Sequence, residues 1–272
     1  MGKVIAIANQ KGGVGKTTSA VNLAASLAAA KRSVLLIDLD PQGSATVGVG
    51  VSRQSIVHSI NSILLGECEI ADAIVPTQSG LDLLPANGDL TVAEVRLLQV
   101  EERERCLAKA ITSIKNNYHF ILIDCPPSLS MLTVNALVSA DSVIIPVQCE
   151  YYALEGLTSL LSSIDHIRKT ANPRLQLEGL LRTMYDGRNR LSVEVSEQLF
   201  AHFGNKVYES VIPRTVRLAE APSHGLPILY YDKHSQGAEA YLAWAGEIIR
   251  HHPLDKKTNG QAKRKKGVET VR

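Results

Sequence analysis

The chain has 272 residues, of which 45% are hydrophobic and 21% are charged, and its formal net charge at pH 7 is +2. This composition predicts one large α/β domain with a sizeable core, and the absence of any apolar run near the roughly 20 residues of a membrane span predicts a soluble protein. Since the chain runs from Met1 almost directly into a predicted strand, with no room for a signal peptide, we expect it in the cytoplasm.

The positive charge is concentrated at the C-terminal end. Residues 253–272 contain seven Lys and Arg residues against two acidic residues, which gives +5 and leaves −3 for residues 1–252. An acidic body cannot bind nucleic acid through a uniformly basic surface, so a local patch or the tail must supply any such contact. We expect residues 1–252 to form one domain and residues 253–272 a disordered basic tail, which is either an auxiliary DNA arm or a solubilising end.

The first predicted strand, residues 4–8, leads into the loop NQKGGVGKTT and then into a helix predicted over residues 17–28. A glycine-rich loop between a strand and a helix directs backbone N–H groups and the positive end of the helix dipole at one point, which favours an anion. Lys16 can reach the β- and γ-phosphates of a nucleotide, and the Thr17 hydroxyl can ligate Mg²⁺. The loop glycines that leave room for phosphate oxygens are Gly12, Gly13 and Gly15.

Strand-like and helix-like segments alternate along the rest of the chain. Apolar β-prone runs predict strands over residues 34–37, 81–84, 120–123, 142–146, 177–184 and 207–212. Helical spacing predicts helices over residues 55–65, 91–115, 131–140, 153–170, 193–203 and 236–250. This alternation predicts an α/β fold with a mostly parallel twisted sheet and helices on both faces, and the glycine-rich loop identifies it as the fold of a P-loop nucleotide hydrolase.

Acidic residues follow two of these strands. In an open parallel sheet, ligands bind beyond the carboxyl ends of the strands, where Asp38, Asp40 and Asp124 are expected. Asp124 follows four apolar residues and is the natural Walker B carboxylate, which holds Mg²⁺ directly or through water; the alternative is a helix-capping role. We expect Asp38 near the metal shell.

The phosphate loop departs from the standard P-loop formula, because Gln10 replaces its first glycine. KGGVGKTT resembles the deviant Walker A motif of the ParA/MinD family. The resemblance to ParA/Soj-type partitioning ATPases extends to about His251 and is carried by four further stretches: LIDLDPQGSAT, FILIDCPPSLSMLTVNAL, IPVQCEYYALEGL and VIPRTVRLAEAPSHGLPI.

This resemblance implies an ATPase that uses ATP and Mg²⁺, forms a homodimer around ATP and binds double-stranded DNA without sequence preference. A ParB-type centromere-binding protein would stimulate hydrolysis and so release the DNA, which implies a nucleoid-associated protein with no membrane partner. The family's extra lysine, matched by Lys11, reaches the partner's nucleotide, and the aspartate matched by Asp40 orients the attacking water. Considered alone, Lys11 is a solvated loop lysine and Asp40 a turn residue before Pro41.

The family motifs also imply residues for the nucleotide and for DNA. The implied nucleotide contacts are Lys11, Gly12, Gly13, Val14, Gly15, Lys16, Thr17 and Thr18, with Pro213 and Thr215 near the adenine. Thr215 replaces the family's common asparagine. The implied DNA contacts are Arg188 and Arg217, to which the stretch DGRNRLS adds Arg190. Arg182, in the preceding strand, is a further cation that either contacts DNA or has a structural role.

Two other classes of protein remain as alternatives. A MinD-like, membrane-associated division-site ATPase would need an amphipathic C-terminal helix, whereas KKTNGQAKRKKGVETVR has almost no large apolar side chains. A small-molecule phosphotransferase or synthetase would need an acceptor site, and the histidines show no recognisable catalytic spacing. The cysteines form no CxxC pair, which argues against a zinc or iron–sulfur site; they are Cys68, Cys106, Cys125 and Cys149.

Overall fold

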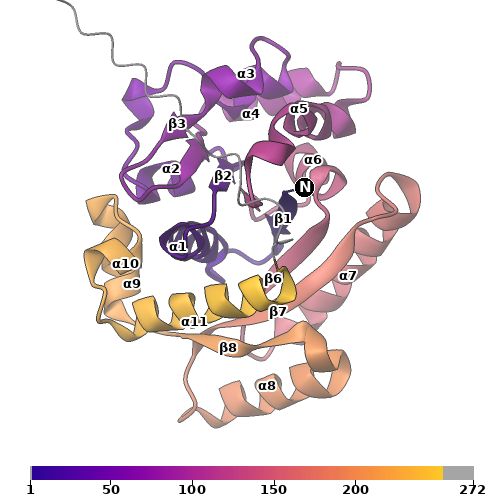
Figure 1. Cartoon of the computed structure of the whole chain (residues 1–272). Coiled ribbons are helices and arrows are strands. Elements are labelled where there is room, and N and C mark those ends of the chain that lie inside the picture. Colours follow the sequence, from indigo (N-terminus) through magenta and orange to yellow (C-terminus); the bar gives the residue numbers. More distant parts are fainter. Residues whose placement is uncertain (1, 254–272) are drawn as a thin grey trace, which may run out of the picture.

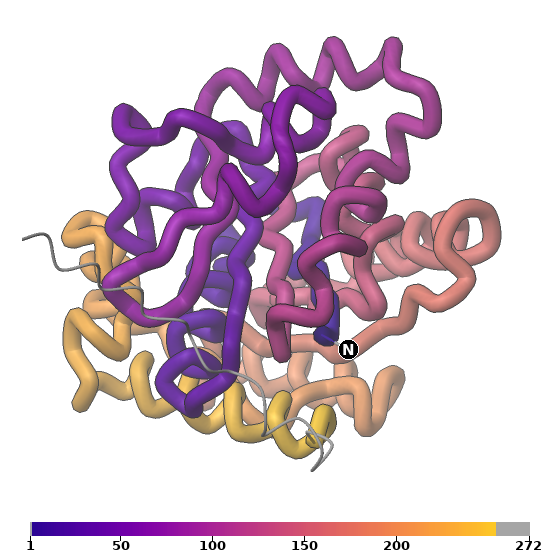
Figure 2. The backbone as a smooth tube through the Cα atoms, turned by 45° about the horizontal axis from the view of Figure 1, so that its top comes forward, coloured from indigo at the N-terminus to yellow at the C-terminus, as the bar shows by residue number. Residues whose placement is uncertain are grey.

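The computed structural model describes residues 2–253, which are built around one eight-stranded sheet (Figures 1 and 2). The strand order is β3-β4-β2-β5-β1-β6-β7-β8, and all neighbouring strands are parallel except β3 and β4. The expected mostly parallel sheet is therefore confirmed. The strands are β1 (Lys3–Ile7), β2 (Val34–Asp38), β3 (Val75–Pro76), β4 (Asp82–Leu84), β5 (Phe120–Asp124), β6 (Ser142–Gln148), β7 (Gln176–Tyr185) and β8 (Val207–Pro213).

Helices cover both faces of the sheet because successive residues of each strand point to opposite sides. Ile5 and Ile7 pack with one group of helices, α1 (Lys16–Ala29), α2 (Ser44–Gly48), α9 (Val216–Glu220), α10 (Ile228–Tyr231) and α11 (Gln236–His251). Val4 and Ala6 pack with the other group, α3 (Ile60–Leu64), α4 (Leu90–Leu97), α5 (Cys106–Ile114), α6 (Met131–Ser139), α7 (Ala153–Thr170) and α8 (Arg190–Phe203). Burial on both faces explains why the central strands read as continuous apolar runs.

One long helix predicted over residues 91–115 is wrong. Helix α4 ends at Leu97, and α5 begins only at Cys106. Between them Glu102 has a φ of +50°, a conformation that does not continue a right-handed helix. The break lets two short apolar faces, one containing Leu97 and the other Leu107, pack into the same core cluster.

The helix predicted over residues 55–65 is also mostly wrong, since α3 begins at Ile60. Ser59 is fully extended, with φ −139° and ψ −178°, and the Ile60 N–H donates to the Pro85 carbonyl at 2.9 Å. This tertiary hydrogen bond replaces the helical one. Among the strands and α-helices, four others had no prediction, namely β3, α2, α9 and α10; each is five residues or shorter, too short to show a periodic pattern.

Residues 254–272 lie outside the described part of the chain, and so does nearly all of the expected tail. Among residues 2–253, no helix combines the length and the apolar character needed to cross a membrane.

Glu178, in β7, joins the two ends of the described chain. Its carboxylate lies 3.2 Å from Lys3 Nζ in β1 and 2.6 Å from His252 Nε2, directly after α11. Burial opposes ionisation of Glu178, but the hydrogen bond from His252 and the charge of Lys3 outweigh it and lower its pKa to about 2, from an ordinary 4.5. The ionised form is therefore more stable in the folded than in the unfolded chain.

We expect Glu178→Gln to lower the free energy of unfolding at neutral pH by roughly 2–3 kcal/mol, because a depressed carboxyl pKa contributes stability above its unfolded value. That contribution is lost in the wild type as the pH falls from about 4.5 towards 2. Urea unfolding of both proteins at several pH values measures this contribution to the free energy of unfolding. The stability difference between the two proteins should shrink across this acid range, and a constant difference would contradict the assignment.

Candidate nucleotide-binding and catalytic site

The glycine-rich loop joins the carboxyl end of β1 to the first turn of α1. Gly13 and Gly15 have φ angles of +73° and +84°, which residues with a Cβ rarely adopt. A Cβ added at Gly12 or Gly13 would meet no atom within 4 Å, so open space lies beside the loop. The loop thus leaves room for a group that approaches the backbone closely.

Two neighbouring strands hold this loop in place. The Asn9 side chain donates to the Pro146 carbonyl at 2.7 Å and accepts from the Lys11 N–H at 3.0 Å. From β7, the buried Thr183 hydroxyl donates to the Val14 carbonyl at 2.8 Å. Sequence reasoning missed both supports. Asn9 was visible as the first residue of the motif, whereas Thr183 lies 169 residues from Val14 and had no local signal.

Lys16 is the buried cation of the site. Its side chain donates to the Lys11 backbone carbonyl at 3.0 Å, and the residue is only 7% exposed. Burial lowers the pKa of Lys16, while the negative charge of Asp124 opposes the shift. A lysine held in a glycine-rich loop in this way is suited to bind phosphate oxygens.

Asp38 and Asp124 are register partners on the adjacent strands β2 and β5, and both are completely buried. Asp38 accepts hydrogen bonds from the Thr46 hydroxyl at 2.7 Å, the Thr46 N–H at 2.8 Å and the Asp40 N–H at 3.2 Å. Burial raises the pKa of Asp38 to about 6, although the bonds from Thr46 oppose the shift. Asp38 therefore orders the start of α2 and the loop that carries Asp40.

Asp124 differs from Asp38, because neither of its carboxylate oxygens has a hydrogen-bond partner among the described residues. Burial raises the pKa of Asp124 well above its ordinary value, and the negative charge of Asp38 adds to the shift, while the positive charge of Lys16 opposes it. An unpaired carboxylate is costly to bury. A hard divalent cation would satisfy these oxygens, so the residues fit Mg²⁺.

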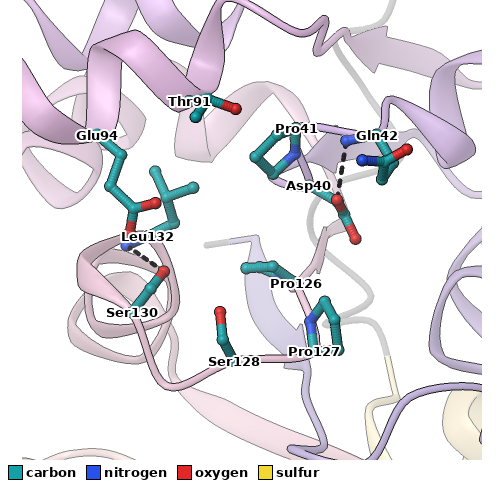
Figure 3. Close-up of a pocket in the computed structure, with 10 residues that line it drawn as sticks. All are labelled: Asp40, Pro41, Gln42, Thr91, Glu94, Pro126, Pro127, Ser128, Ser130 and Leu132. Carbon is teal, nitrogen blue, oxygen red and sulfur yellow. Dashed lines mark hydrogen bonds between the residues drawn. The ribbon is translucent and has the colours of Figure 1, made fainter.

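Asp40 lines a pocket of about 310 Å³ between the loops that follow β2 and β5 (Figure 3). One of its oxygens accepts from the Gln42 N–H at 2.9 Å. Across the pocket lie the turn at Pro126 and Pro127 and, from α4, Thr91 and Glu94. The loop after Asp38 and the loop after Asp124 therefore face each other across one space.

A second cavity, of about 610 Å³, contains residues from distant parts of the chain. Gly15 and Thr18 line it from the glycine-rich loop and α1, and Pro213 and Thr215 line it from the end of β8 and the start of α9. The Thr215 hydroxyl accepts from the Leu218 N–H at 3.3 Å and so caps α9. The cavity is large enough for the base and sugar of a nucleotide.

Lys11 is on the same loop as Lys16 but has a different environment. Its ammonium lies 2.8 Å from Glu150, on the loop after β6, and both side chains are exposed. A pair of this kind contributes little to stability and exchanges readily with other partners.

The arginines expected to contact DNA all form exposed ion pairs. Arg188 pairs with Asp186 at 2.9 Å, Arg190 with Glu194 at 2.7 Å and Arg217 with Glu220 at 3.1 Å. Arg182, by contrast, is buried. Its guanidinium donates to the Ser196 hydroxyl and to the carbonyls of Tyr208 and Glu209, and it lies 4.7 Å from the centre of the Phe200 ring. Within residues 2–253 Arg182 forms no salt bridge to a carboxylate, and its hydrogen bonds give it a structural role.

The described residues contain no group of three His, Cys, Asp or Glu side chains that could hold a metal ion. A cation at Asp124 would therefore need other oxygen ligands, such as the Thr17 hydroxyl and the phosphates of a nucleotide. A glycine-rich loop between a parallel strand and a helix, with a buried lysine and an aspartate at the end of the neighbouring strand, defines a P-loop nucleotide hydrolase.

Comparisons with known proteins narrow this class. A protein-family model described as an AAA domain matches residues 2–177. The chain is 51% identical to the chromosome partitioning protein ParA of Caulobacter vibrioides, over 91% of this chain and 94% of that protein. It is also 51% identical to the sporulation initiation inhibitor protein Soj of Bacillus subtilis, over 91% of this chain and 98% of that protein.

Among solved structures, the chain resembles cobyrinic acid a,c-diamide synthase from Mycobacterium smegmatis, which was solved with a bound ATP analogue and magnesium. The two are 39% identical in sequence, and their structures match with a TM-score of 0.82 over 92% of this chain and 96% of that chain. The chain belongs to the ParA/Soj family of chromosome-partitioning ATPases.

Proposed function

We propose that this protein dimerises around ATP, binds double-stranded DNA without sequence preference and releases it after hydrolysis stimulated by a ParB-type centromere-binding protein. It would act in the cytoplasm, at the nucleoid. The observation that carries the proposal is the environment of Lys11, an exposed lysine on the phosphate loop whose partner, Glu150, is also exposed. Such a lysine is free to move to the nucleotide of a second copy.

ATP and Mg²⁺ are the cofactors that fit the site, and a structural neighbour was solved with an ATP analogue and magnesium. The loop amides and Lys16 bind the phosphates, and the cavity beside Pro213 and Thr215 holds the nucleoside. Thr17 and Asp124 would hold Mg²⁺, directly or through water, and the ion would supply positive charge at the phosphate oxygens. Asp40 orients the attacking water, and the second copy's lysine adds one more cation where negative charge develops.

The same arrangement connects the nucleotide to DNA. In the described chain each expected DNA contact is already paired with an acid, and residues 1–252 carry −3, so one copy holds DNA weakly. Dimerisation doubles the number of arginines that face one duplex. The affinity for DNA then rises. The affinity also depends more steeply on salt, because the slope of log K against log salt concentration becomes more negative by about 0.9 for each neutralised phosphate.

We expect Arg217→Ala to weaken ATP-dependent DNA binding at least about tenfold and to reduce the salt slope by about 2 per dimer, because each copy loses one phosphate contact. Fluorescence anisotropy with a labelled duplex at several salt concentrations measures both quantities. Arg168→Ala is the matched control, since Arg168 is also exposed and paired with an acid three residues away. Equal loss in the two variants would count against the assignment.

The whole proposal is tested by ATP hydrolysis with DNA and a ParB-type protein added separately and together. We expect the largest rate with both. Flotation with anionic liposomes tests the alternative, a membrane-associated ATPase. ATP-dependent flotation without retention on DNA would replace this proposal with that of a membrane-associated ATPase.

A further inference from the structure

Helix α4 has an exposed apolar face that the proposed activity does not use. Its buried side, around Leu90 and Leu97, packs into the core. On the outside, Val92, Val95 and Leu98 follow one another at three-residue spacing and are 62%, 65% and 53% exposed. Side chains at this spacing form one continuous ridge, which we call the α4 ridge.

The α4 ridge adjoins the pocket that contains Asp40. Thr91 and Glu94, from the same helix, line that pocket opposite the turn at Pro126 and Pro127 (Figure 3). Glu94 is half-buried and has no hydrogen-bond or ion-pair partner among residues 2–253. A molecule on the ridge would therefore reach both loops that follow the catalytic strands.

The charge around α4 identifies the occupant. Residues 67–109, which include α4 and the basic residues that pair with its acidic neighbours, contain nine acidic and four basic residues, a net charge of −5, which leaves +2 for the rest of residues 1–252. A membrane surface of anionic lipids and DNA are both repelled by such a segment. A second copy of the same face is repelled as well. A partner that covers the ridge needs basic residues for the segment and apolar side chains for the ridge.

The chain's own tail has the right charge but not the right side chains. Residues 254–272 carry seven basic residues, whereas their only large apolar residues are Leu254, Val268 and Val271. Only Val268 and Val271 are close enough in sequence to lie on one side of a helical turn, so the tail cannot match all three side chains of the ridge. An external protein segment fits better.

We propose that the α4 ridge is the docking surface for a basic, amphipathic segment of a partner protein, which places a cationic side chain in the pocket between Asp40 and Glu94. The proposal rests on the proposed function, because it locates the contact through which a partner stimulates hydrolysis. The expected DNA contacts are on α8, the loop before it and α9, away from α4 in both views (Figures 1 and 2). DNA and the partner can therefore be bound together.

The test uses the full chain, ATP and the ParB-type protein of the same genome as the probe. The triple variant Val92→Ser, Val95→Ser, Leu98→Ser removes apolar surface without changing charge or core packing. We expect it to bind the probe at least about tenfold more weakly and to lose most of the stimulated rate, while basal hydrolysis and DNA binding stay unchanged. Leu242→Ser, which alters an exposed apolar residue on α11, should behave as wild type.

Hydrogen exchange locates the contact. Amides of residues 90–98 should be protected when the probe is added and not before. Wild-type affinity and stimulation in the triple variant would overturn the proposal. So would faster exchange of residues 90–98, without the probe, in a variant with Lys263, Arg264, Lys265 and Lys266 changed to Gln, since the tail would then be the occupant.

Failure of this inference is distinguishable from failure of the proposed function. A protein that hydrolyses no ATP, or never retains DNA, contradicts the proposed function. A protein that does both, and whose triple variant responds fully to the probe, contradicts only the docking surface.

Discussion

Replacing Lys11 with alanine should lower the stimulated rate of ATP hydrolysis by about 100- to 1,000-fold, the usual cost of removing one positive group aimed at a developing charge. ATP binding by a single chain should change little. Lys16 donates to the backbone carbonyl of Lys11, at 3.0 Å, and this contact survives the loss of the side chain. The exposed pair with Glu150 contributes little to folding, so the variant should be as stable as the wild type.

Three measurements separate the roles of Lys11: phosphate release with DNA and a ParB-type protein, binding of a fluorescent ATP analogue, and mass in solution by light scattering with ATP. The variant should bind the analogue, remain monomeric and release DNA. Glu150→Gln is the control, because it removes the partner within the chain and leaves the ammonium in place. If Lys11→Ala dimerises and hydrolyses ATP normally, the shared site is wrong; if it fails to bind ATP as a monomer, Lys11 acts in its own site.

Much of the fold follows from local sequence, because the central strands are buried on both faces and cannot be mistaken for amphipathic segments. The runs before Asp38 and Asp124 are the clearest examples. The errors occur where a tertiary contact decides a local conformation. The reversal at Glu102 and the late start of α3 at Ile60 both bring short apolar faces into the core, and no periodic pattern contains that information.

The residues of the site also differ in whether they could be predicted from the local sequence. The loop glycines, Lys16 and the strand-end aspartates are recognisable because their chemistry depends on neighbours in sequence. Thr183 and Thr46 are not, since each acts through one hydrogen bond to a group that the fold brings near. The two aspartates also look alike in sequence, and only the structure shows that Asp38 accepts three hydrogen bonds while Asp124 accepts none from the described residues.

This difference predicts opposite effects of the same substitution at the two aspartates. Without metal and nucleotide, Asp124→Asn removes a buried charge that has no hydrogen-bond partner and lies beside Asp38. We expect the unfolding temperature in EDTA to rise by about 2–4 °C for each kcal/mol of relieved repulsion. Asp38→Asn should instead destabilise the protein by about 1–3 kcal/mol, because an amide NH₂ would face the N–H donors of Asp40 or Thr46.

In the presence of Mg²⁺ and ATP, we expect the wild type to be more stable than Asp124→Asn, the reverse of the result in EDTA. The wild type should gain stability from the ligands, whereas Asp124→Asn should gain little and should hydrolyse ATP at least about 100-fold more slowly, because the metal has lost its buried carboxylate. Thermal unfolding with EDTA and then with Mg²⁺ and ATP, followed by phosphate release, measures all three quantities. A variant that is less stable than the wild type in EDTA, or that keeps its magnesium-dependent stabilisation, would show that Asp124 is a structural residue. On this proposal, a buried carboxylate without a hydrogen-bond partner is unfavourable in the protein alone and becomes favourable when the metal and the nucleotide bind together.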